Sequence, residues 1–518
     1  MRSFTRVKKI NGIEYIYEIT PYYDPATKKT RHHSKYLGKK LGDSMTPVKT
    51  KNNLPKNCYT MGELLLPMQA VRELGIDELL SFYLDDKNVK TVLSMAINRV
   101  VEPDPCYLIE DWYADTMLVK IYGQLPLSGQ TLSKLLELIG DSGLAWEFSK
   151  RLVERLGVVD TVVFDITSLG SYSELIEMLE YGYNRDKDGN PQVNLGLYVD
   201  RKADLPFGFD VYPGSIVDVS TLKNTIKKIR SLGIDKTCLV IDRGFFSQDN
   251  VEELAASGLD FIMPATGKLR QVKELLSGSR RGIDHMEYAH KIEDRTIYAR
   301  PVTLNLDNVS VQAYCYFDPV KKEEDRTVFT QRLMNVKAAL EGLNIQNWKN
   351  HRSVFEKTAG SLENYLSYEF KDGKYKVWFK DNAVSRRINR MGVYLLTYKG
   401  NFGADECLLT YRERDVVEKG FDQLKNDVKK IPLGVKKDDT LRGLLFIYFV
   451  ALILRMRINA IMREKKLRGK YTLGQMNKLL KKYKKFELAN GELIDSEIPK
   501  KTRMLLEQLD HMPKTVGR

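Results

Sequence analysis

The chain has 518 residues, of which 43% are hydrophobic and 29% charged, and its formal net charge is +14. This length allows two to four domains with a sizeable core, and the composition is that of a soluble globular protein. Its five cysteines are scattered, with no CxxC pair, which fits a reducing compartment and argues against a structural zinc site.

The positive charge is concentrated at the two ends of the chain. Residues 1–57 hold 13 Lys and Arg against 4 Asp and Glu, residues 426–518 hold 22 against 10, and the middle is left at −7. Two basic ends around a mildly acidic centre predict a polyanionic partner, and nucleic acid is the natural one. The alternative is a solvated, lysine-rich surface without a partner.

The amino-terminal third predicts two regions. Strand patterns at 13–19 and 30–37, joined by the turn-like "YYDPATKK", indicate a basic β-hairpin region over residues 1–57. From 58 to 157 the apolar periodicity is mostly helical, and we expect a helical DNA-binding domain there. The first residues lack the apolar segment of a secretory signal, so we expect a cytoplasmic protein, associated with the nucleoid when bound to DNA.

The sequence pattern changes at Val158. The run "VVDTVVFDITSL" is apolar and β-rich and ends on a charge at Asp165, and "KTCLVIDRGFF" is a second buried strand that ends on Asp242. The strands "VNLGLYVD" and "FGFDVYPG" and a helix lie between them. Three strands in succession followed by alternating helix and strand predict an α/β domain with a mixed sheet covered by helices, over residues 158–440.

Two further segments complete the predicted organisation. Residues 268–399 turn irregular and then β-rich, which predicts an inserted β subdomain. The apolar run "GLLFIYFVALIL" from Gly443 is too short to span a bilayer, so we expect a buried helix and no membrane role. Residues 441–518 are expected to form a helical, basic carboxy-terminal region.

Three acidic residues predict a metal site. Asp165 and Asp242 each end an apolar run, where a carboxylate is costly unless a cation meets it; each alone could instead be a strand-end turn or a helix cap. With Glu418 they would form a set of oxygen ligands, which favours Mg²⁺ or Mn²⁺ over zinc. Two such ions about 4 Å apart activate an attacking oxygen and stabilise the leaving one in phosphodiester chemistry.

The stretch "TYRERDVVEKGFDQLKND" at 410–427 places Tyr411, Arg414, Glu418 and Lys425 at helical spacing, beside an apolar stripe. The simplest interpretation is a surface ion pair between Arg414 and Glu418, worth a few tenths of a kcal/mol. If Glu418 instead holds a metal, Arg414 and Lys425 can hold DNA phosphates, and Tyr411 can donate to a phosphate or stack on a base. The helix would then combine one metal ligand with three DNA-holding groups.

The spacing Tyr411-x2-Arg414-x3-Glu418-x6-Lys425 resembles the YREK signature of the DDE transposases of bacterial insertion sequences. "FDITS" around Asp165 and "IDRGF" around Asp242 resemble the two aspartate motifs of that superfamily, the insertion sequence 4 superfamily. The basic hairpin ending in "KYLGK" looks most like its insertion sequence 1634 branch. The resemblance covers residues 158–460 well and the ends loosely.

The resemblance implies an RNase H-like catalytic core over 158–440 with a β-rich insertion at 268–399. It implies that Asp165, Asp242 and Glu418 are the catalytic residues and hold Mg²⁺, with Mn²⁺ as a substitute and two ions in the site. It also implies that Tyr411, Arg414 and Lys425 contact the transposon end. The expected activity is binding of terminal inverted repeats, followed by metal-dependent strand cleavage and transfer. The expected partners are double-stranded end and target DNA, held by a homodimer on paired ends.

Two other functions remain open from the sequence. A structure-specific nuclease on a similar core would need the three acids, but neither the four-residue helix motif nor so large an insertion. A domesticated transposase that acts only as a DNA-binding regulator would be free to lose an acid, and this chain has kept Asp165, Asp242 and Glu418.

Overall fold

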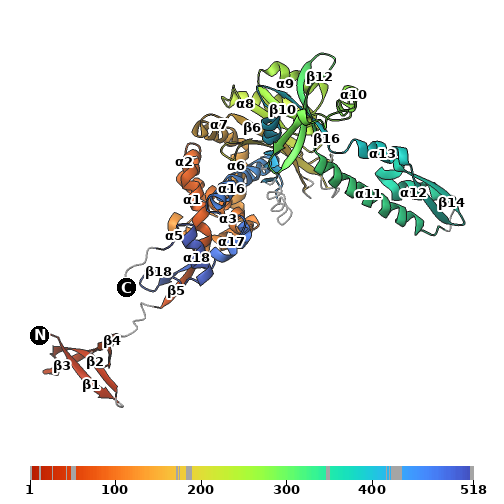
Figure 1. Cartoon of the computed structure of the whole chain (residues 1–518). Helices are drawn as coiled ribbons and strands as arrows, with labels where there is room; N and C mark the ends of the chain where they lie inside the picture. The colour runs from red at the N-terminus through yellow and green to blue at the C-terminus, as the bar shows by residue number, and fades with distance from the viewer. Residues whose placement is uncertain are drawn as a thin grey trace. The chain divides into compact units, whose positions relative to one another are not determined.

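The computed structural model describes residues 3–10, 13–25, 27–41, 44–47, 54–170, 173, 175–182, 190–216, 218–345, 350–415, 417–418, 420–421 and 435–513 (Figure 1). The chain forms two compact units that interleave in sequence. The first unit comprises residues 1–69, 108–125 and 462–518, and the second comprises residues 70–107 and 126–461. The predicted domain boundaries at 57, 157 and 440 remain predictions.

A nine-stranded mixed sheet is the framework of the second unit. Its order is β11-β12-β13-β16-β10-β9-β6-β7-β8. The strands are β6 (Thr161–Gly170), β7 (Gln192–Asp200), β8 (Leu205–Pro213), β9 (Cys238–Ile241), β10 (Asp260–Pro264), β11 (Ala289–Ile292), β12 (Arg295–Asn305), β13 (Ser310–Phe317) and β16 (Val393–Lys399). Strand β9 runs parallel to both of its neighbours, β6 and β10, and the other pairs are antiparallel. The predicted mixed α/β sheet is thereby confirmed.

Helices accompany the sheet in the predicted order. After β6, β7 and β8 the chain forms α8 (Asp218–Ser231), β9, α9 (Gln248–Ser257), β10 and α10 (Arg270–Ser279), which lie beside the sheet in Figure 1. Every residue of β7 is buried, as are the first nine of β6. Near-continuous apolar runs are typical of strands covered on both faces, which is why these two were recognisable in the sequence.

The apolar run at 443 belongs to a longer helix, α16 (Asp438–Glu464). Phe446 and Phe449 meet Phe148 of α7 (Leu144–Leu156) edge-on, at ring-centroid distances of 5.4 and 6.2 Å, and Phe449 lies 5.0 Å from Phe209 of β8. Among the described helices α16 alone has the length and apolar character to cross a membrane. Its most apolar window is 83% buried within the protein, as a core helix would be.

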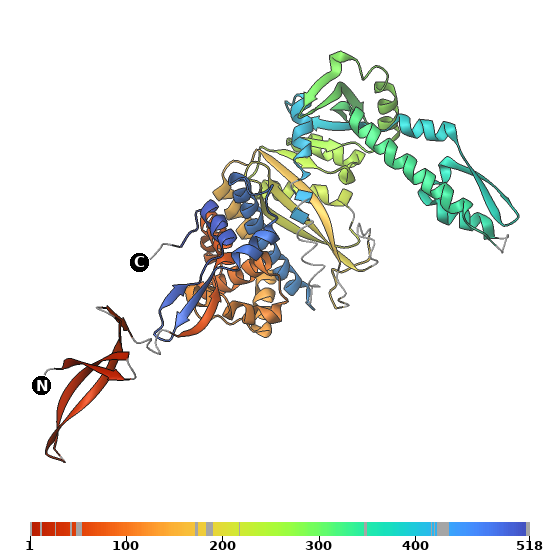
Figure 2. The ribbon, with the colours of Figure 1, turned by 60° about the horizontal axis from the view of Figure 1, so that its bottom comes forward.

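The segment between β10 and β16 differs from the β-rich insertion that the sequence predicts. Strands β11, β12 and β13 join the main sheet instead of forming a sheet of their own. The remainder is a mixed subdomain of α11 (Pro319–Glu341), α12 (His351–Ala359), the hairpin β14 (Leu366–Lys371) and β15 (Lys374–Phe379), and α13 (Asp381–Asn389), visible in Figure 2. Its own core includes Phe329, Leu333, Phe355, Leu366 and Val377.

Helix α11 escaped the sequence analysis because its apolar stripe is thin. Of its 23 residues only Phe329, Leu333 and Leu340 are buried, and charged side chains surround them. The start of the helix carries the stronger signal: the Asp318 side chain accepts a hydrogen bond from the Lys321 amide at 2.9 Å, and Pro319 occupies the first turn. An Asp-Pro pair at a helix start combines a capping carboxylate with a fixed backbone angle.

The region over 58–157 is mostly helical, as the sequence predicts. It contains α1 (Leu65–Leu74), α2 (Ile76–Ser81), α3 (Asp86–Val101), α4 (Ile109–Ala114), α5 (Leu118–Tyr122), α6 (Gly129–Asp141) and α7. Its DNA-binding role stays a prediction.

Two small sheets belong to the first unit. The predicted hairpin is β2 (Ile13–Asp24) paired with β3 (Lys29–Leu41), flanked by β1 (Phe4–Ile10) and β4 (Ser44–Pro47) in one four-stranded antiparallel sheet. A second sheet pairs β5 (Pro55–Thr60) with β17 (Lys484–Leu488) and β18 (Leu493–Asp495), beside α17 (Leu473–Leu480) and α18 (Lys500–Gln508). The carboxy-terminal region is therefore not purely helical, because "KKFEL" finds a strand partner more than 420 residues earlier in the chain.

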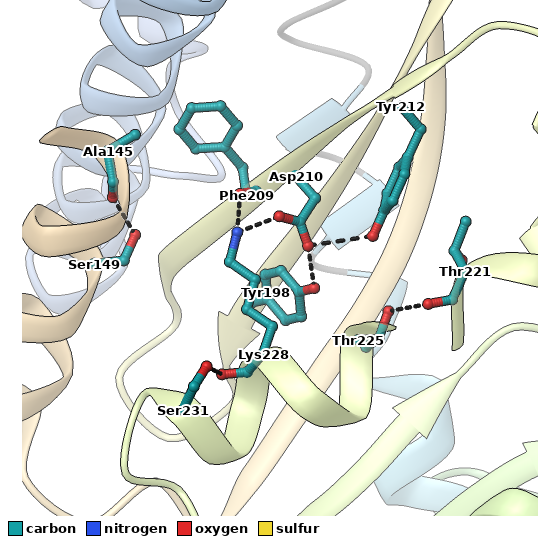
Figure 3. Close-up of polar contacts among 10 residues, drawn as sticks. All are labelled: Ala145, Ser149, Tyr198, Phe209, Asp210, Tyr212, Thr221, Thr225, Lys228 and Ser231. Atoms are coloured by element: carbon teal, nitrogen blue, oxygen red, sulfur yellow. Dashed lines mark hydrogen bonds and ion pairs between the residues drawn. The ribbon is translucent and has the colours of Figure 1, made fainter. Parts of the chain in front are cut away.

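A polar cluster fastens α8 to β7 and β8 (Figure 3). The Lys228 ammonium of α8 contacts the Asp210 carboxylate and donates to the Phe209 carbonyl at 2.9 Å. The hydroxyls of Tyr198 and Tyr212 both donate to the same carboxylate. Burial and Asp210 raise the pKa of Tyr198 well above its usual value, so its hydroxyl remains a donor. Asp210 thus has all its partners within the protein, and losing one leaves a half-buried charge uncompensated.

We therefore expect Lys228→Met to lower the free energy of unfolding by about 3 kcal/mol, because it leaves the Asp210 carboxylate without its cation. Thermal unfolding would measure the loss as a fall in Tm. The control is Lys227→Met, which removes an exposed charge from the preceding residue of the same helix. Equal Tm values for the two variants would contradict the role of the cluster.

Candidate active site

The pairing of β6 with β9 brings two of the predicted acids together. The two strands run parallel in a register that matches Thr161 with Cys238 and Phe164 with Ile241. The next residue of each strand is Asp165 on one side and Asp242 on the other, so the two carboxylates stand at the same level of the sheet. Asp165 is only 2% exposed, and it accepts a hydrogen bond from the Ile166 amide at 2.8 Å.

The two aspartates differ in their backbone setting. Asp242 directly follows β9, as the sequence predicts. Asp165 was predicted to end its strand, and this was wrong: β6 continues to Gly170. The reason is the neighbour on the other side, because β7 pairs with β6 along its whole length, including Asp165 with Leu197. The charge of Asp165 therefore interrupts a buried strand, which makes a compensating cation more necessary.

The helix that carries the third acid is interrupted. One continuous helix was predicted through Thr410–Asp427, but α14 (Ala404–Arg412) ends at Arg412. Glu413 and Arg414 form a turn, and helical structure resumes at Asp415. At the turn the Arg414 amide donates to the Tyr411 carbonyl at 3.2 Å, a contact three residues back, and Arg201 holds Glu413 by an ion pair. The turn lets the Glu413 side chain reach Arg201, the residue after β7. It also lets the Arg414 side chain reach Asp165 and Asp242.

The guanidinium of Arg414 is the meeting point of the three acids. Its Nη1 atom lies 2.6 Å from Asp242 Oδ1 and 3.9 Å from Asp165 Oδ2, and its Nη2 atom contacts Glu418 Oε1. The Arg414 side chain is 14% exposed. The interpretation of Arg414 and Glu418 as an ordinary surface pair therefore falls short, because the same guanidinium also binds the two aspartates of the sheet.

Tyr411 completes this arrangement. Its ring centroid lies 5.5 Å from the Arg414 guanidinium, within the range of a cation–π contact. Burial raises the pKa of Tyr411 to about 12 although Arg414 opposes the shift, so the hydroxyl is a donor at neutral pH. Burial likewise works against the charge of Arg414, but Tyr411 and the three carboxylates outweigh it and raise its pKa. The guanidinium is thus firmly charged.

The fourth residue of the motif, Lys425, lies outside the described residues. Its predicted contact with the transposon end stays a prediction.

The acids fit a divalent metal in charge and in ligand type. Asp165, Asp242 and Glu418 offer only carboxylate oxygens, which Mg²⁺ and Mn²⁺ prefer. Three carboxylates around one guanidinium leave the cluster with two negative charges in excess. In the described part of the chain no three His, Cys, Asp or Glu side chains approach closely enough to hold a metal directly. The Arg414 guanidinium accounts for this, since it stands between the acids.

A cavity of about 670 Å³ opens beside the acids. Asp242, Tyr411 and Arg414 are among the residues that line it. Its other charged lining residues are mostly cationic and come from several elements: Arg243, Lys321, Arg387, Arg390 and Arg412, against Asp318 and Asp325. The cavity is therefore suited to a polyanion that reaches the acids.

The sequence analysis missed the cations that α13 contributes. Arg387 belongs to α13 and Arg390 is the residue that caps its carboxy-terminal end, three positions later, so the same side of the helix end can present both. Neither forms an ion pair with a carboxylate of the described residues, and the same holds for Arg243. The cluster "RRINR" at 386–390 was the available signal. Nothing local indicated that α13 stands next to Asp242, more than 140 residues earlier in the chain.

Comparison with known proteins decides the family. The family model described as the transposase DDE domain matches residues 152–454, which is more than half of the chain. The chain belongs to the DDE transposase family. The matched range contains Asp165, Asp242 and Glu418.

The other comparisons add little to this transposase. No curated protein matches the chain. One solved structure that resembles it is a piggyBac transposase synaptic complex with hairpin DNA, at 10% identity, over 89% of each chain and with a TM-score of 0.36. At that TM-score the likeness is too weak to define the fold.

The position of Arg414 in this transposase predicts a link between metal binding and stability. Arg414→Gln leaves three carboxylates facing one another, so we expect Tm without divalent ions to fall by several degrees. Mn²⁺ or Mg²⁺ should then raise Tm more in the variant than in the unmodified protein, because no guanidinium competes for the acids.

Thermal unfolding with and without each ion measures this difference. The control is Arg412→Gln, whose side chain pairs with Glu293 and Asp318 and not with the three acids. A metal-induced rise in Tm that is the same in all three proteins would show that Arg414 does not stand in the place of a metal.

Proposed function

We propose that this transposase binds the terminal inverted repeats of an insertion sequence, cuts there and joins the freed 3′ ends to a target by cut-and-paste transposition. We also propose that its mixed sheet is an RNase H-like core and that it belongs to the insertion sequence 1634 branch of the insertion sequence 4 superfamily. The observation that carries the proposal is the convergence of Asp165, Asp242 and Glu418 on one guanidinium at the edge of a basic cavity.

The cavity residues would hold the DNA backbone. Arg243, Arg387 and Arg390 line the cavity and have no carboxylate partner among the described residues, so phosphates can take their hydrogen bonds. A planar guanidinium binds a phosphate through two parallel hydrogen bonds, which fixes its orientation as well as its position. The strand would thereby be positioned with its scissile phosphate next to the acids.

Arg414 would exchange partners during the reaction. In the structure it offsets one of the three negative charges of the acids, and it also lines the cavity, where it can meet a phosphate. When Mg²⁺ is bound by the acids, it supplies activation of the attacking oxygen and stabilisation of the leaving oxygen. The guanidinium released from the carboxylates would then hold the incoming phosphate, and the Tyr411 hydroxyl could donate to the same strand. Removal of Arg414 should therefore weaken DNA positioning as well as stability.

The partners of this reaction would be double-stranded end DNA and target DNA. Cut-and-paste joining requires two ends to be held together, so we propose a homodimer on paired ends. The two other functions left open by the sequence would give different results in the same assay. A structure-specific nuclease would cut DNA without joining it, and a regulator would bind DNA without cutting it.

The first test removes the charge of each acid with little change in volume. Asp165→Asn, Asp242→Asn and Glu418→Gln should each lower Mg²⁺-dependent cleavage and strand transfer by roughly two orders of magnitude or more, because each loses a metal ligand. Binding of end DNA in a mobility-shift assay should stay close to normal.

Asp160→Asn, which alters an exposed carboxylate just before β6, is the control and should cut normally. A variant of Asp165, Asp242 or Glu418 that cuts at the unmodified rate would exclude that residue from the site. Cutting without any joined product in the unmodified protein would favour the nuclease.

A second test concerns the cations of the cavity. The double variant Arg387→Gln/Arg390→Gln should weaken end binding and make its dependence on salt shallower, since each phosphate contact contributes about 0.9 to the slope of log K against log salt. Fluorescence anisotropy over a salt series measures both quantities. Arg386→Gln is the matched control, because it lies on the same helix but does not line the cavity. If Arg386→Gln changes the salt slope by half as much as the double variant, the effect per substituted residue is the same and the cavity is not the DNA site.

A further inference from the structure

The four-stranded amino-terminal sheet has very little core of its own. Among the described side chains of β1, β2 and β3, only Ile19 and Gly38 are buried. Sheets of a few strands usually owe their stability to an apolar face that packs against something. Charged and tyrosine side chains outnumber the exposed apolar side chains of Phe4, Val7, Ile10 and Ile13 in β1–β3, so a polar counter-surface is the fitting partner.

The strand register assigns each side chain to one of two faces. In β1 and β2, Arg6 is opposite Tyr17 and Lys8 is opposite Tyr15, and in β2 and β3, Tyr15 is opposite Lys39 and Tyr17 is opposite Tyr36. Directly opposed residues of antiparallel strands share a face. We call this side the tyrosine face, and its cations and clustered tyrosines are Arg6, Lys8, Tyr15, Tyr17, Tyr36 and Lys39. The exposed side chains of Phe4, Ile10, Ile13 and Tyr23 lie on the same side.

The carboxylates of the sheet all lie on the other side, which we call the carboxylate face. Glu14, Glu18 and Asp24 alternate with the tyrosines along β2, and Lys9, Lys29, Arg31, Lys35 and Lys40 share that side with them. Two of these acids form ion pairs there, Glu14 with Lys40 at 3.7 Å and Asp24 with Arg31 at 2.9 Å. The cations of the carboxylate face are therefore partly neutralised.

The cations of the tyrosine face are not neutralised. Arg6, Lys8 and Lys39 form no ion pair with a carboxylate in the described part of the chain, and no acid of β1–β3 shares their face. All three are exposed. A group of uncompensated cations on an exposed surface is complementary to a polyanion.

The tyrosines hold two of these cations in place. The Tyr36 ring lies 5.8 Å from Tyr15 and 5.3 Å from Tyr17, the Lys8 ammonium is 5.0 Å from the Tyr17 centroid, and the Lys39 ammonium is 5.9 Å from that of Tyr15. Bases of a single strand stack on open ring faces, but here ammonium groups stand over two of the rings. The arrangement favours contact with phosphates over stacking of bases.

The tyrosine face suits a duplex. Its defined residues occupy two neighbouring positions on each of three strands, about 7 Å along the strands and about 10 Å across them. A duplex presents the denser phosphate charge to such a patch, one charge per about 1.7 Å of its axis against about 3.4 Å for a single strand. We propose that the tyrosine face binds double-stranded DNA through its phosphates, independently of base sequence. The inference rests on the proposed function only in taking DNA as the polyanion.

The test uses the full-length protein and two double variants that remove equal charge from opposite faces. Lys8→Gln/Lys39→Gln alters the tyrosine face, and Lys9→Gln/Lys40→Gln alters the adjacent residues of the same strands on the carboxylate face. Binding is measured by anisotropy over a salt series with an end duplex, a scrambled duplex of equal length and a single strand.

For both duplexes we expect the tyrosine-face variant to have a slope shallower by about 2, and the carboxylate-face variant to keep the unmodified slope. Equal slopes for the two variants would overturn the proposal. A loss restricted to the end duplex would also overturn it, because it would show reading of bases, and so would a larger loss with the single strand.

A second measurement needs no variant and so does not depend on folding of a mutant. Scrambled duplex should protect Lys8 and Lys39 of the unmodified protein from acetylation several-fold, while Lys9 and Lys40 react at nearly the same rate with and without DNA. Equal protection of all four would count against a face-specific site. Failure of this inference is distinguishable from failure of the proposed function. If only this inference is wrong, the unmodified protein still cuts end DNA with Mg²⁺. If the proposed function is wrong, the unmodified protein does not cut end DNA.

Discussion

The parallel pairing of β6 with β9 is the constraint on which the candidate site depends. Its register continues one residue beyond the last paired positions and sets Asp165 beside Asp242 on two interior strands of a nine-stranded sheet. Because Asp165 is 2% exposed and lies within a strand, water cannot hydrate its charge, and another group must compensate it. A fold that brings two carboxylates together in this way must also place a cation beside them. This requirement explains the position of Arg414.

Arg414 meets that requirement through an interruption of its helix. The turn at Glu413 and Arg414 allows the guanidinium to contact both aspartates while it also binds Glu418 one turn further on. A guanidinium suits this position because it presents several donors in one plane and remains charged when buried. The same geometry suits a phosphate equally well. In the proposed function one side chain would thus bind the acids at one time and a DNA strand at another, which a lysine would do with less directional control.

The insertion between β10 and β16 gives the site its basic surroundings. Three of its strands widen the main sheet, and its α13 delivers Arg387 and Arg390 to the cavity beside Asp242. In the proposed function these cations offset the repulsion between the carboxylates and the DNA backbone. The net charge of the chain, +14, does not show how its charges are distributed. The acids lie at the main sheet, cations line the cavity beside them, and further cations lie on one face of the amino-terminal sheet.

The sequence by itself determined many of the local elements and predicted the residues of the candidate site. Apolar runs predicted β6, β7 and α16, and the strand-and-helix order predicted the mixed sheet, because buried elements need apolar side chains along their length. The apolar runs singled out Asp165 and Asp242, and the motif spacing singled out Tyr411, Arg414, Glu418 and Lys425. Only the tertiary structure decided that Asp165 lies within its strand, that the motif helix breaks at Glu413, and that α13 and β17 find partners far away in the chain. These features depend on strand register and on contacts between segments separated by more than a hundred residues, and local periodicity carries no record of either.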